Sequence, residues 1–238
     1  MYETTTAQHY AAYRPPLHET ILEKIFTLPG NRQRGLDIGC GTGLSCQALT
    51  RYCNHVIGID PSLAMLSEAT TQPGISYLNA DGQRIPLTGN SIDVVTMAGS
   101  LNYLDRKLLI AELTRVCRSD AEIAVYDFEI DLSHFESRFA IDTSTDSGGY
   151  NHRLNLSGFS EIEEICVVNA EVMLHPAADE IAHLLLADDR WYGSLQEQFY
   201  PRNVFESLKQ EIESIDTRFK IKASIHYSLY QMTKIVSR

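Results

Sequence analysis

The residues whose types and spacing best suit ligand binding form a glycine-rich loop directly after a short apolar segment. The run Leu36-Asp37-Ile38-Gly39-Cys40-Gly41-Thr42-Gly43 has an acid within the apolar segment and three glycines after it. Glycine has no side chain, so a loop of this kind lets backbone amides and the start of the next helix approach a ligand closely. The run predicts a buried strand that leads into a cofactor-binding loop.

The spacing of the glycines distinguishes two classes of nucleotide cofactor. A dinucleotide fingerprint G-x-G-x-x-G needs a third glycine at position 44, where this chain has Leu44; its glycine comes one place earlier, at Gly43. The spacing therefore favours S-adenosylmethionine (SAM) over NAD. Asp37 is then expected beside the positive ammonium group of the methionine moiety, with capping of neighbouring amides as the alternative.

Two more acids follow the next two apolar segments. Asp60 ends the second segment, where its carboxylate can accept both hydrogen bonds from a ribose diol, a feature that SAM and NAD sites share. Asp81 follows the third segment, within reach of the exocyclic amine of an adenine. The glycine loop and the two acids together predict a SAM site.

Five short apolar segments alternate with amphipathic stretches between residues 34 and 127, as is typical of parallel strands connected by helices on both faces of a sheet. The first expected strand ends at Ile38, and the other four span 55–59, 75–78, 92–97 and 122–126. The expected helices span about 44–52, 63–71 and 105–118.

The regular alternation of apolar and amphipathic segments ends after residue 127. The polar, glycine-rich segment 144–149 predicts a loop, 162–173 a strand, and 176–186 and 201–212 helices. Strict alternation over 219–229 predicts a half-buried strand. One face is expected to carry Phe219, Ile221, Ala223, Ile225, Tyr227 and Leu229, and the other Lys220, Lys222, Ser224, His226 and Ser228.

From Leu36 to about Phe128 the chain resembles the class I SAM-dependent methyltransferases, and more closely their type 11, small-molecule group. The matching segments are LDIGCGTG, VIGIDPSLAML, NADGQRIPL followed by NSIDVV, and a helix ending in ELTRVCR. The resemblance implies a Rossmann-like α/β fold with three αβα layers, a small helical cap and a seven-stranded, mostly parallel sheet whose last strand is antiparallel. We expect one methyltransferase domain over 1–238, with a helical lead-in (1–30), a SAM-binding core (34–128), a cap with the sixth strand (129–215) and the last strand (218–231).

The resemblance also implies a cofactor site. The glycine loop lines the methionine portion, Asp60 holds the ribose, Met65 packs near the adenine, and Asp81 with the Gly82 backbone reads the adenine edge. The segment 10–16 resembles a lead-in whose tyrosine and arginine close over the SAM carboxylate. The expected cofactor-binding residues are Tyr13, Arg14, Asp37, Gly39, Cys40, Gly41, Gly43, Asp60, Pro61, Met65, Asp81, Gly82, Ala98 and Ser100.

The residues that act on the methyl acceptor are left open. Many relatives have His-Trp where this chain has Asn102-Tyr103, so the resemblance does not supply a histidine base there. A carboxylate acceptor needs no base, whereas a hydroxyl or amine makes one useful. Trp191 is expected either to anchor helix packing or to form a pocket wall. The acceptor-positioning candidates are Asn102, Tyr103, Tyr150, His152, Trp191 and Tyr192.

Composition narrows the partners. A chain of 238 residues, 44% of them hydrophobic, can bury the core of one α/β domain, and its net charge of −11 opposes binding to nucleic acid. Five cysteines without a C-x-x-C pair and histidines without clustered spacing predict reduced thiols and no metal. With no signal peptide and no run of about 20 apolar residues, we expect a cytoplasmic monomer or homodimer that does not enter a membrane.

The expected function is methyl transfer from SAM to a small molecule by in-line displacement, at oxygen, nitrogen or a carboxyl group, with S-adenosylhomocysteine (SAH) as product. A SAM-binding regulator or partner protein without turnover is the alternative. An NAD-dependent oxidoreductase is less favoured because of Leu44.

Overall fold

A computed structural model describes residues 6, 8–9, 12–26, 32–141 and 149–233. The chain divides into two compact units, which are treated separately. The first, here called the sheet unit, comprises Leu17–Phe128, Tyr150–Ala170 and Ile225–Arg238. The second, the helical unit, comprises Met1–Pro16, Glu129–Gly149 and Glu171–Ser224. The expected single domain over the whole chain stays a prediction.

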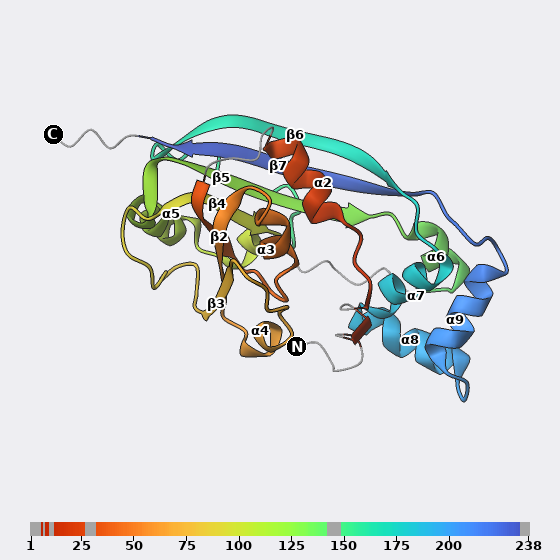
Figure 1. Cartoon of the computed structure of the whole chain (residues 1–238). Coiled ribbons are helices and arrows are strands. Elements are labelled where there is room, and N and C mark those ends of the chain that lie inside the picture. Colours follow the sequence, from red (N-terminus) through yellow and green to blue (C-terminus); the bar gives the residue numbers. More distant parts are fainter. Residues whose placement is uncertain (1–5, 7, 10–11, 27–31, 142–148, 234–238) are drawn as a thin grey trace. The chain divides into compact units, whose positions relative to one another are not determined.

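Seven strands form one sheet in the order β3-β2-β1-β4-β5-β7-β6 (Figure 1). The pairs β1–β2, β1–β4, β2–β3 and β4–β5 are parallel, which confirms the predicted α/β class with a mostly parallel sheet. The strands are β1 (Arg32–Ile38), β2 (Cys53–Asp60), β3 (Ile75–Asn79), β4 (Ile92–Ala98), β5 (Cys117–Ile130), β6 (Ile162–Leu174) and β7 (Ile221–Met232).

The last strand is antiparallel, as predicted. β5 and β6 begin in the sheet unit and end in the helical unit, whereas β7 begins in the helical unit and ends in the sheet unit. Since β7 lies between β5 and β6, it must run opposite to both, and the arrows in Figure 1 show this direction.

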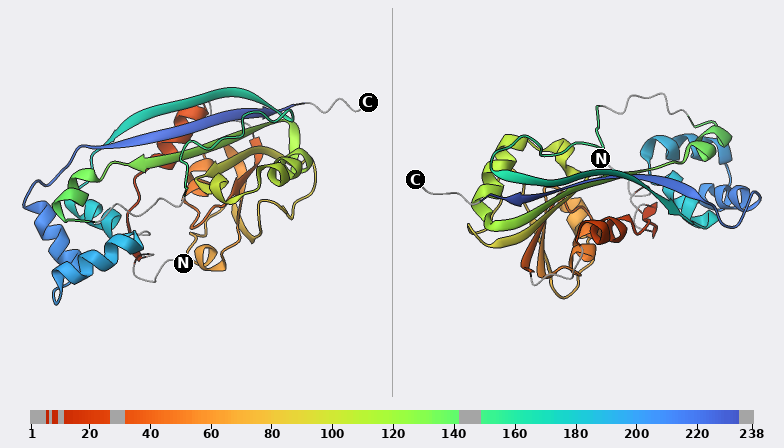
Figure 2. Two further views of the ribbon diagram at one scale, coloured as in Figure 1. Left: turned by 180° about the vertical axis from the view of Figure 1, so that it is seen from behind. Right: turned by 90° about the horizontal axis from the view of Figure 1, so that it is seen from above.

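The two faces of β1 are covered by different helices. Gly35 and Asp37 face α3 (Leu44–Leu49): a Cβ at Gly35 would lie 2.9 Å from Leu49, and Asp37 accepts hydrogen bonds from Ser45 and Cys46. Leu36 and Ile38 belong instead to the apolar cluster that contains four residues of α5 (Arg106–Val116). Helices therefore cover both faces of the sheet unit, with α2 (Leu17–Ile25) and α3 on one side and α5 on the other (Figure 2, right).

Helix boundaries follow local caps more closely than the apolar pattern. α4 (Leu63–Ser67) is capped by Ser62 as expected but ends four residues before the predicted Thr71. It buries no residue, so no apolar face stabilises further turns. α3 likewise ends at Leu49 rather than near residue 52, and β5 extends the expected 122–126 in both directions.

The helical unit has its own core. The helices α6 (Ser133–Arg138), α7 (Ala178–Leu186), α8 (Asp189–Phe199) and α9 (Val204–Glu213) contribute to one apolar cluster. Asn203 accepts a hydrogen bond from the Glu206 amide at 3.0 Å and so starts α9 three residues after the predicted Pro201. α6 and α8 were absent from the predicted elements.

The expected alternation of β7 is wrong beyond residue 225. Lys222 is exposed and Ile225 buried, as predicted, but His226 and Ser228 of the expected polar face are also buried. In the sheet unit β7 is an inner strand, and Tyr230 belongs to the same apolar cluster as α5. Both faces of this half of the strand are therefore covered, so an alternating sequence does not give one solvated face.

Candidate functional site

The carboxyl ends of five parallel strands meet at one edge of the sheet unit, where ligands of open α/β sheets bind. Along that edge the order of strands is β3, β2, β1, β4 and β5. The segments that follow them begin at Ala80, Pro61, Gly39, Gly99 and Asp131. The structure thus brings together three groups that lie far apart in the sequence: the glycine loop and the acids Asp60 and Asp81.

The glycine loop is tightly bounded. Gly39 has φ +72°, and a Cβ there would lie 2.4 Å from Cβ of Ser100; Gly43 has φ +86°, and its Cβ would lie 2.1 Å from the Tyr77 hydroxyl. Side chains at these two positions are excluded by both backbone conformation and space. The amides of Gly39 and Cys40 both donate to the carbonyl of Ile59, which ties the loop to β2.

Asp60 joins the glycine loop to the loop after β2. Its Oδ2 accepts a hydrogen bond from the Gly41 amide at 2.9 Å, and its Oδ1 accepts one from the Ser62 amide at 2.8 Å. Asp60 as a whole residue is 9% exposed. Each carboxylate oxygen has a second lone pair, so the fixed Asp60 can still accept hydrogen bonds from a diol.

Asp37 is completely buried and bound by three side chains. Ser45 Oγ donates at 2.5 Å, Thr96 Oγ1 at 2.7 Å and Cys46 Sγ at 3.2 Å. Burial raises the pKa of Asp37, and the three hydrogen bonds oppose that effect. These donors are side chains and not the amides of the capping alternative. The contact of Asp37 with a methionine ammonium stays a prediction.

The adenine end of the expected site lies after β3. Asp81 is exposed and accepts a hydrogen bond from the Gln83 amide at 2.8 Å, whereas Gly82 is buried against Ile38. Met65, partly buried, lies beside the glycine loop, because a Cβ at Gly41 would be 3.6 Å from its Cε. Pro61 is held through its carbonyl, which accepts a hydrogen bond from Asn79 at 2.9 Å.

The segment after β4 is tied to β1. Ser100 Oγ donates to the Ile38 carbonyl at 2.5 Å, directly after Ala98 and Gly99. In the short helix η1 (Ser100–Tyr103), Asn102 exchanges two hydrogen bonds with the backbone of Asn151, at 2.9 and 3.2 Å. Tyr103 is 77% exposed.

An acid that the sequence analysis did not select lies near the end of β5. Asp127 Oδ2 accepts a hydrogen bond from the Tyr150 hydroxyl at 2.8 Å, and His152 Nδ1 lies 3.2 Å from the same oxygen. The Tyr150 hydroxyl is also 2.8 Å from the Gly99 carbonyl. Asp127 follows the expected fifth strand directly, as Asp60 ends the second, and this was the available signal.

Four of the expected site residues belong to the helical unit. Burial and the nearby Glu180 raise the pKa of Tyr13 to about 12. Trp191 and Tyr192 in α8 pack against the core of that unit. Arg14 belongs to the same unit, whereas Tyr10 lies outside the described residues. The expected contacts of these residues with cofactor or acceptor stay predictions.

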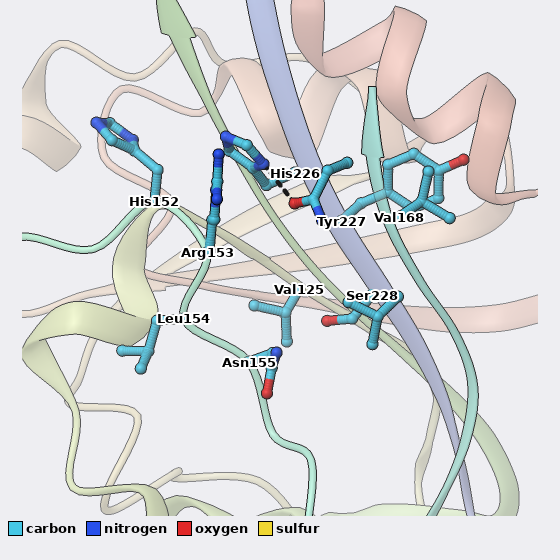
Figure 3. Close-up of a pocket in the computed structure, with 11 residues that line it drawn as sticks. Val125, His152, Arg153, Leu154, Asn155, Val168, His226, Tyr227 and Ser228 are labelled. Atoms are coloured by element: carbon cyan, nitrogen blue, oxygen red, sulfur yellow. Dashed lines mark hydrogen bonds between the residues drawn. The ribbon is translucent and has the colours of Figure 1, made fainter. Parts of the chain in front are cut away.

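A recess lies on the sheet unit beside β5, β6 and β7 (Figure 3). His152 and His226 both line it, and His226 is bonded to Asn169 at 2.7 Å. None of the expected cofactor-binding residues is among its lining residues. The recess is therefore separate from the glycine loop.

Among the residues with described positions, no group of three His, Cys, Asp or Glu side chains is arranged to hold a metal ion. Within the same residues, no helix is long and apolar enough to cross a membrane.

The strand order, the antiparallel last strand and the glycine loop at the carboxyl edge define the class I methyltransferase fold. Residues 36–125 match the family described as "Methyltransferase domain". A solved structure from Anaeromyxobacter dehalogenans, provisionally assigned as a type II methyltransferase, superposes with a TM-score of 0.64 at 17% identity, over 93% of this chain and 98% of that one. Residues 36–125 of the chain are thus similar to a methyltransferase family, and the fold of the chain agrees with that similarity.

Two curated relatives match the same part of the chain. CRG1 of Saccharomyces cerevisiae, provisionally assigned as a SAM-dependent methyltransferase, is 32% identical over 127 residues, which are 50% of this chain and 44% of the relative. A demethylmenaquinone methyltransferase of Renibacterium salmoninarum is 31% identical over 110 residues, covering 45% and 46%. The chain thus spans less than half the length of these relatives.

Proposed function

We propose that the chain catalyses transfer of a methyl group from SAM to a small-molecule acceptor. The observation that carries the proposal is the position of Asp60, whose two carboxylate oxygens are fixed by amides of the glycine loop and of the loop after β2. A carboxylate held between these loops suits a ribose diol, with the methionine portion on one side and the adenine on the other.

The residues at the edge fit this cofactor. Gly39 and Gly43 leave space that a Cβ would fill, and the glycine loop would hold the methionine portion there. Asp60 would hold the ribose, and Asp81 with the Gly82 backbone would hold the adenine. Bound SAM supplies an electrophilic methyl group on a positively charged sulfur. The chain's own residues have to orient the acceptor behind that methyl and exclude water.

Two observations support a small acceptor. The net charge of −11 disfavours a polyanionic substrate. The matched relative from Renibacterium salmoninarum is a demethylmenaquinone methyltransferase, and menaquinones are small molecules.

Calorimetry with SAH tests the cofactor site. Asp60→Ala is expected to weaken SAH binding by about 1–3 kcal/mol, because it removes charge-assisted hydrogen bonds to the ribose. Asp120→Ala is the matched control, since Asp120 is an exposed acid near the other end of β5. Absence of SAH binding by the wild-type chain, or equal binding by Asp60→Ala, would contradict the proposal.

Turnover is tested separately with methyl-tritiated SAM and a panel of phenols, amines and carboxylates. Labelling of any acceptor establishes methyl transfer. Tight binding of SAH without labelling of any acceptor would instead favour a SAM-binding protein without turnover.

A further inference from the structure

The β3–β4 loop, residues 80–91, carries the acid that is expected at the adenine. Asp81 lies near its start, directly before Gly82. Gly82 packs against the end of β1, because a Cβ there would lie 2.5 Å from Ile38 Cγ2. Ile85 is 3% exposed and belongs to the same apolar cluster as the buried residues of α5. The loop is therefore packed against both β1 and α5.

An ion pair on α5 binds the middle of this loop. Arg115 is bonded to Glu112 through Nε at 2.9 Å and through Nη2 at 2.7 Å. Arg115 Nη2 also donates to the Ile85 carbonyl, and Nη1 donates to the Leu87 carbonyl, both at 2.7 Å. Glu112 Oε2 in turn accepts a hydrogen bond from the Ile85 amide at 2.7 Å. The two side chains together bind three backbone groups of the β3–β4 loop.

This ion pair differs from an isolated pair on a protein surface. An isolated pair contributes little, because solvent screens the charges and both side chains lose conformational freedom. Here the planar guanidinium of Arg115 binds two carbonyls and a carboxylate at once, in directions that its geometry fixes. Its hydrogen bonds also lower the pKa of Glu112, which is therefore ionised at neutral pH and accepts from the Ile85 amide. The pair thus fixes the path of the loop backbone.

Gln83 connects the carboxylate of Asp81 with the start of α5. Its amide donates to Asp81 Oδ1 at 2.8 Å, and its side-chain Nε2 donates to both carboxylate oxygens at 3.3 Å. Gln83 Oε1 accepts a hydrogen bond from the amide of Asp105 at 3.2 Å. Asp105 is the N-cap of α5 and accepts hydrogen bonds from two amides of its first turn. The side chain that orients Asp81 is therefore itself held by the helix.

An oriented carboxylate can distinguish purines by the group at position 6. Adenine presents an amine there, which donates hydrogen bonds, whereas a 6-oxo purine presents an oxygen, which accepts them. An ionised carboxylate only accepts, so opposite a 6-oxo group it loses a hydrogen bond and meets another lone pair. The neighbouring N1 of a 6-oxo purine carries a proton, and a mobile carboxylate could turn to it. Because Asp81 is exposed, discrimination requires that its side chain be held in place.

Resting on the proposed function, we propose that the Asp81 carboxylate is fixed to select a 6-amino purine by three positioning residues: Gln83, Glu112 and Arg115. Gln83 acts on the carboxylate directly, whereas the pair on α5 acts through the backbone of the β3–β4 loop. Loss of any of the three leaves Asp60 and the glycine loop unchanged in sequence. The selectivity for the purine should therefore fall more than the affinity for the ribose.

The test compares two ligands of the full chain by titration calorimetry. One is SAH, and the other is S-inosylhomocysteine, which differs from SAH in carrying a 6-oxo purine. The wild-type chain is expected to bind SAH about tenfold more tightly, the change expected for one hydrogen bond to a charged group. Gln83→Leu and Arg115→Met should each reduce this ratio to less than about threefold, because the carboxylate can then turn to N1–H.

Arg118→Met is the matched control for Arg115→Met. The two arginine side chains are 44% and 43% exposed, and each is paired with a carboxylate. The partner of Arg118 is Asp93 of β4, at 2.6 Å. Arg118→Met should therefore leave the ratio of affinities within twofold of the wild-type value. A second comparison uses Asp81→Ala, in which the ratio should be close to one and should not change further when Arg115→Met is added.

The outcomes separate a positioning role from a purely structural one. If Gln83→Leu and Arg115→Met weaken SAH binding but keep the wild-type ratio, or if Arg115→Met changes the ratio in the Asp81→Ala chain, the proposal is overturned. Equal affinities of the wild-type chain for the two ligands also overturn it, while the proposed function stands because SAH binds. If urea denaturation shows that Arg115→Met does not fold, Gln83→Leu decides by the same criterion. Failure of the wild-type chain to bind SAH contradicts the proposed function itself.

Discussion

Substitution of Gly43 by alanine tests the shape of the glycine loop most directly. Gly43 has φ +86°, and an added Cβ would lie 2.1 Å from the Tyr77 hydroxyl and 2.8 Å from Tyr77 Cζ. The left-handed conformation costs an alanine about 1–2 kcal/mol. The clash must also displace Tyr77, whose hydroxyl donates to the Thr70 carbonyl at 3.3 Å, and losing that bond adds about 0.5–1.5 kcal/mol. We expect Gly43→Ala to lose about 2–3 kcal/mol of unfolding free energy.

Gly158→Ala is the matched control, because it separates the two contributions. Gly158 has φ +94° but nothing within 4 Å of an added Cβ, so its substitution carries the backbone cost alone. Urea denaturation of both variants should show Gly43→Ala less stable than Gly158→Ala by about 1 kcal/mol, the cost of the lost hydrogen bond. Adding Tyr77→Phe should recover part of that difference, since it removes the nearest atom. Equal stabilities of the two alanine variants, or no recovery, would refute the close contact between the loop and Tyr77.

Two other features give predictions of a different kind. Leu113→Ala in α5 should cost about 2–5 kcal/mol in urea denaturation, because Leu113 is completely buried, whereas Leu108→Ala in the same helix, at a site 54% exposed, should change stability by less than about 0.5 kcal/mol; similar losses would place the core on the wrong face of α5. In the helical unit, burial lowers the pKa of His9 and of His183, whose Nδ1 atoms lie 2.9 Å apart. Around and below pH 6.5, the ordinary histidine pKa, the unfolded chain then binds more protons than the native chain. The free energy of unfolding should therefore fall as the pH drops below about 7. Denaturation of His183→Gln at several pH values should show a smaller fall, and an unchanged slope would contradict this account.

The sheet and its glycine loop were predictable because short-range rules determine them. The run from Leu36 to Gly43 is apolar where β1 is buried on both faces and glycine-rich where the backbone must adopt positive φ. The lengths of α4 and β5 were less predictable, since they depend on what covers them. α4 buries no residue and stops early, whereas β5 lengthens beyond its apolar centre as a partner of β7. Packing in the tertiary structure also buries His226, although the alternating sequence of β7 predicts that its side chain faces solvent.

The parts of the candidate site also differ in how far the sequence predicts them. Asp60 and the glycine loop directly follow apolar segments that the sequence predicts as strands. Because the carboxyl ends of parallel strands lie at one edge of the sheet, the sequence also predicts that these two groups lie close together. The association of Asp127 with Tyr150 and His152 could not be predicted in this way. More than 20 residues separate Asp127 from the other two, and no strand was predicted in between that would bring them to the same edge of the sheet. His152 entered the sequence analysis as one of several possible acceptor contacts, and only the structure places its Nδ1 3.2 Å from the Asp127 carboxylate.

That difference explains why the cofactor could be inferred before the acceptor. The expected contacts of the nucleoside and the methionine portion are backbone groups and acids at the ends of β1, β2 and β3, and these features leave a spacing in the sequence. The residues expected near the acceptor in the sheet unit come from η1 and from the segment after residue 149, where the Tyr150 hydroxyl donates to Asp127 of β5 and the Asn151 amide donates to Asn102. Their combination is set by the tertiary fold, so it leaves no spacing in the sequence that could predict it.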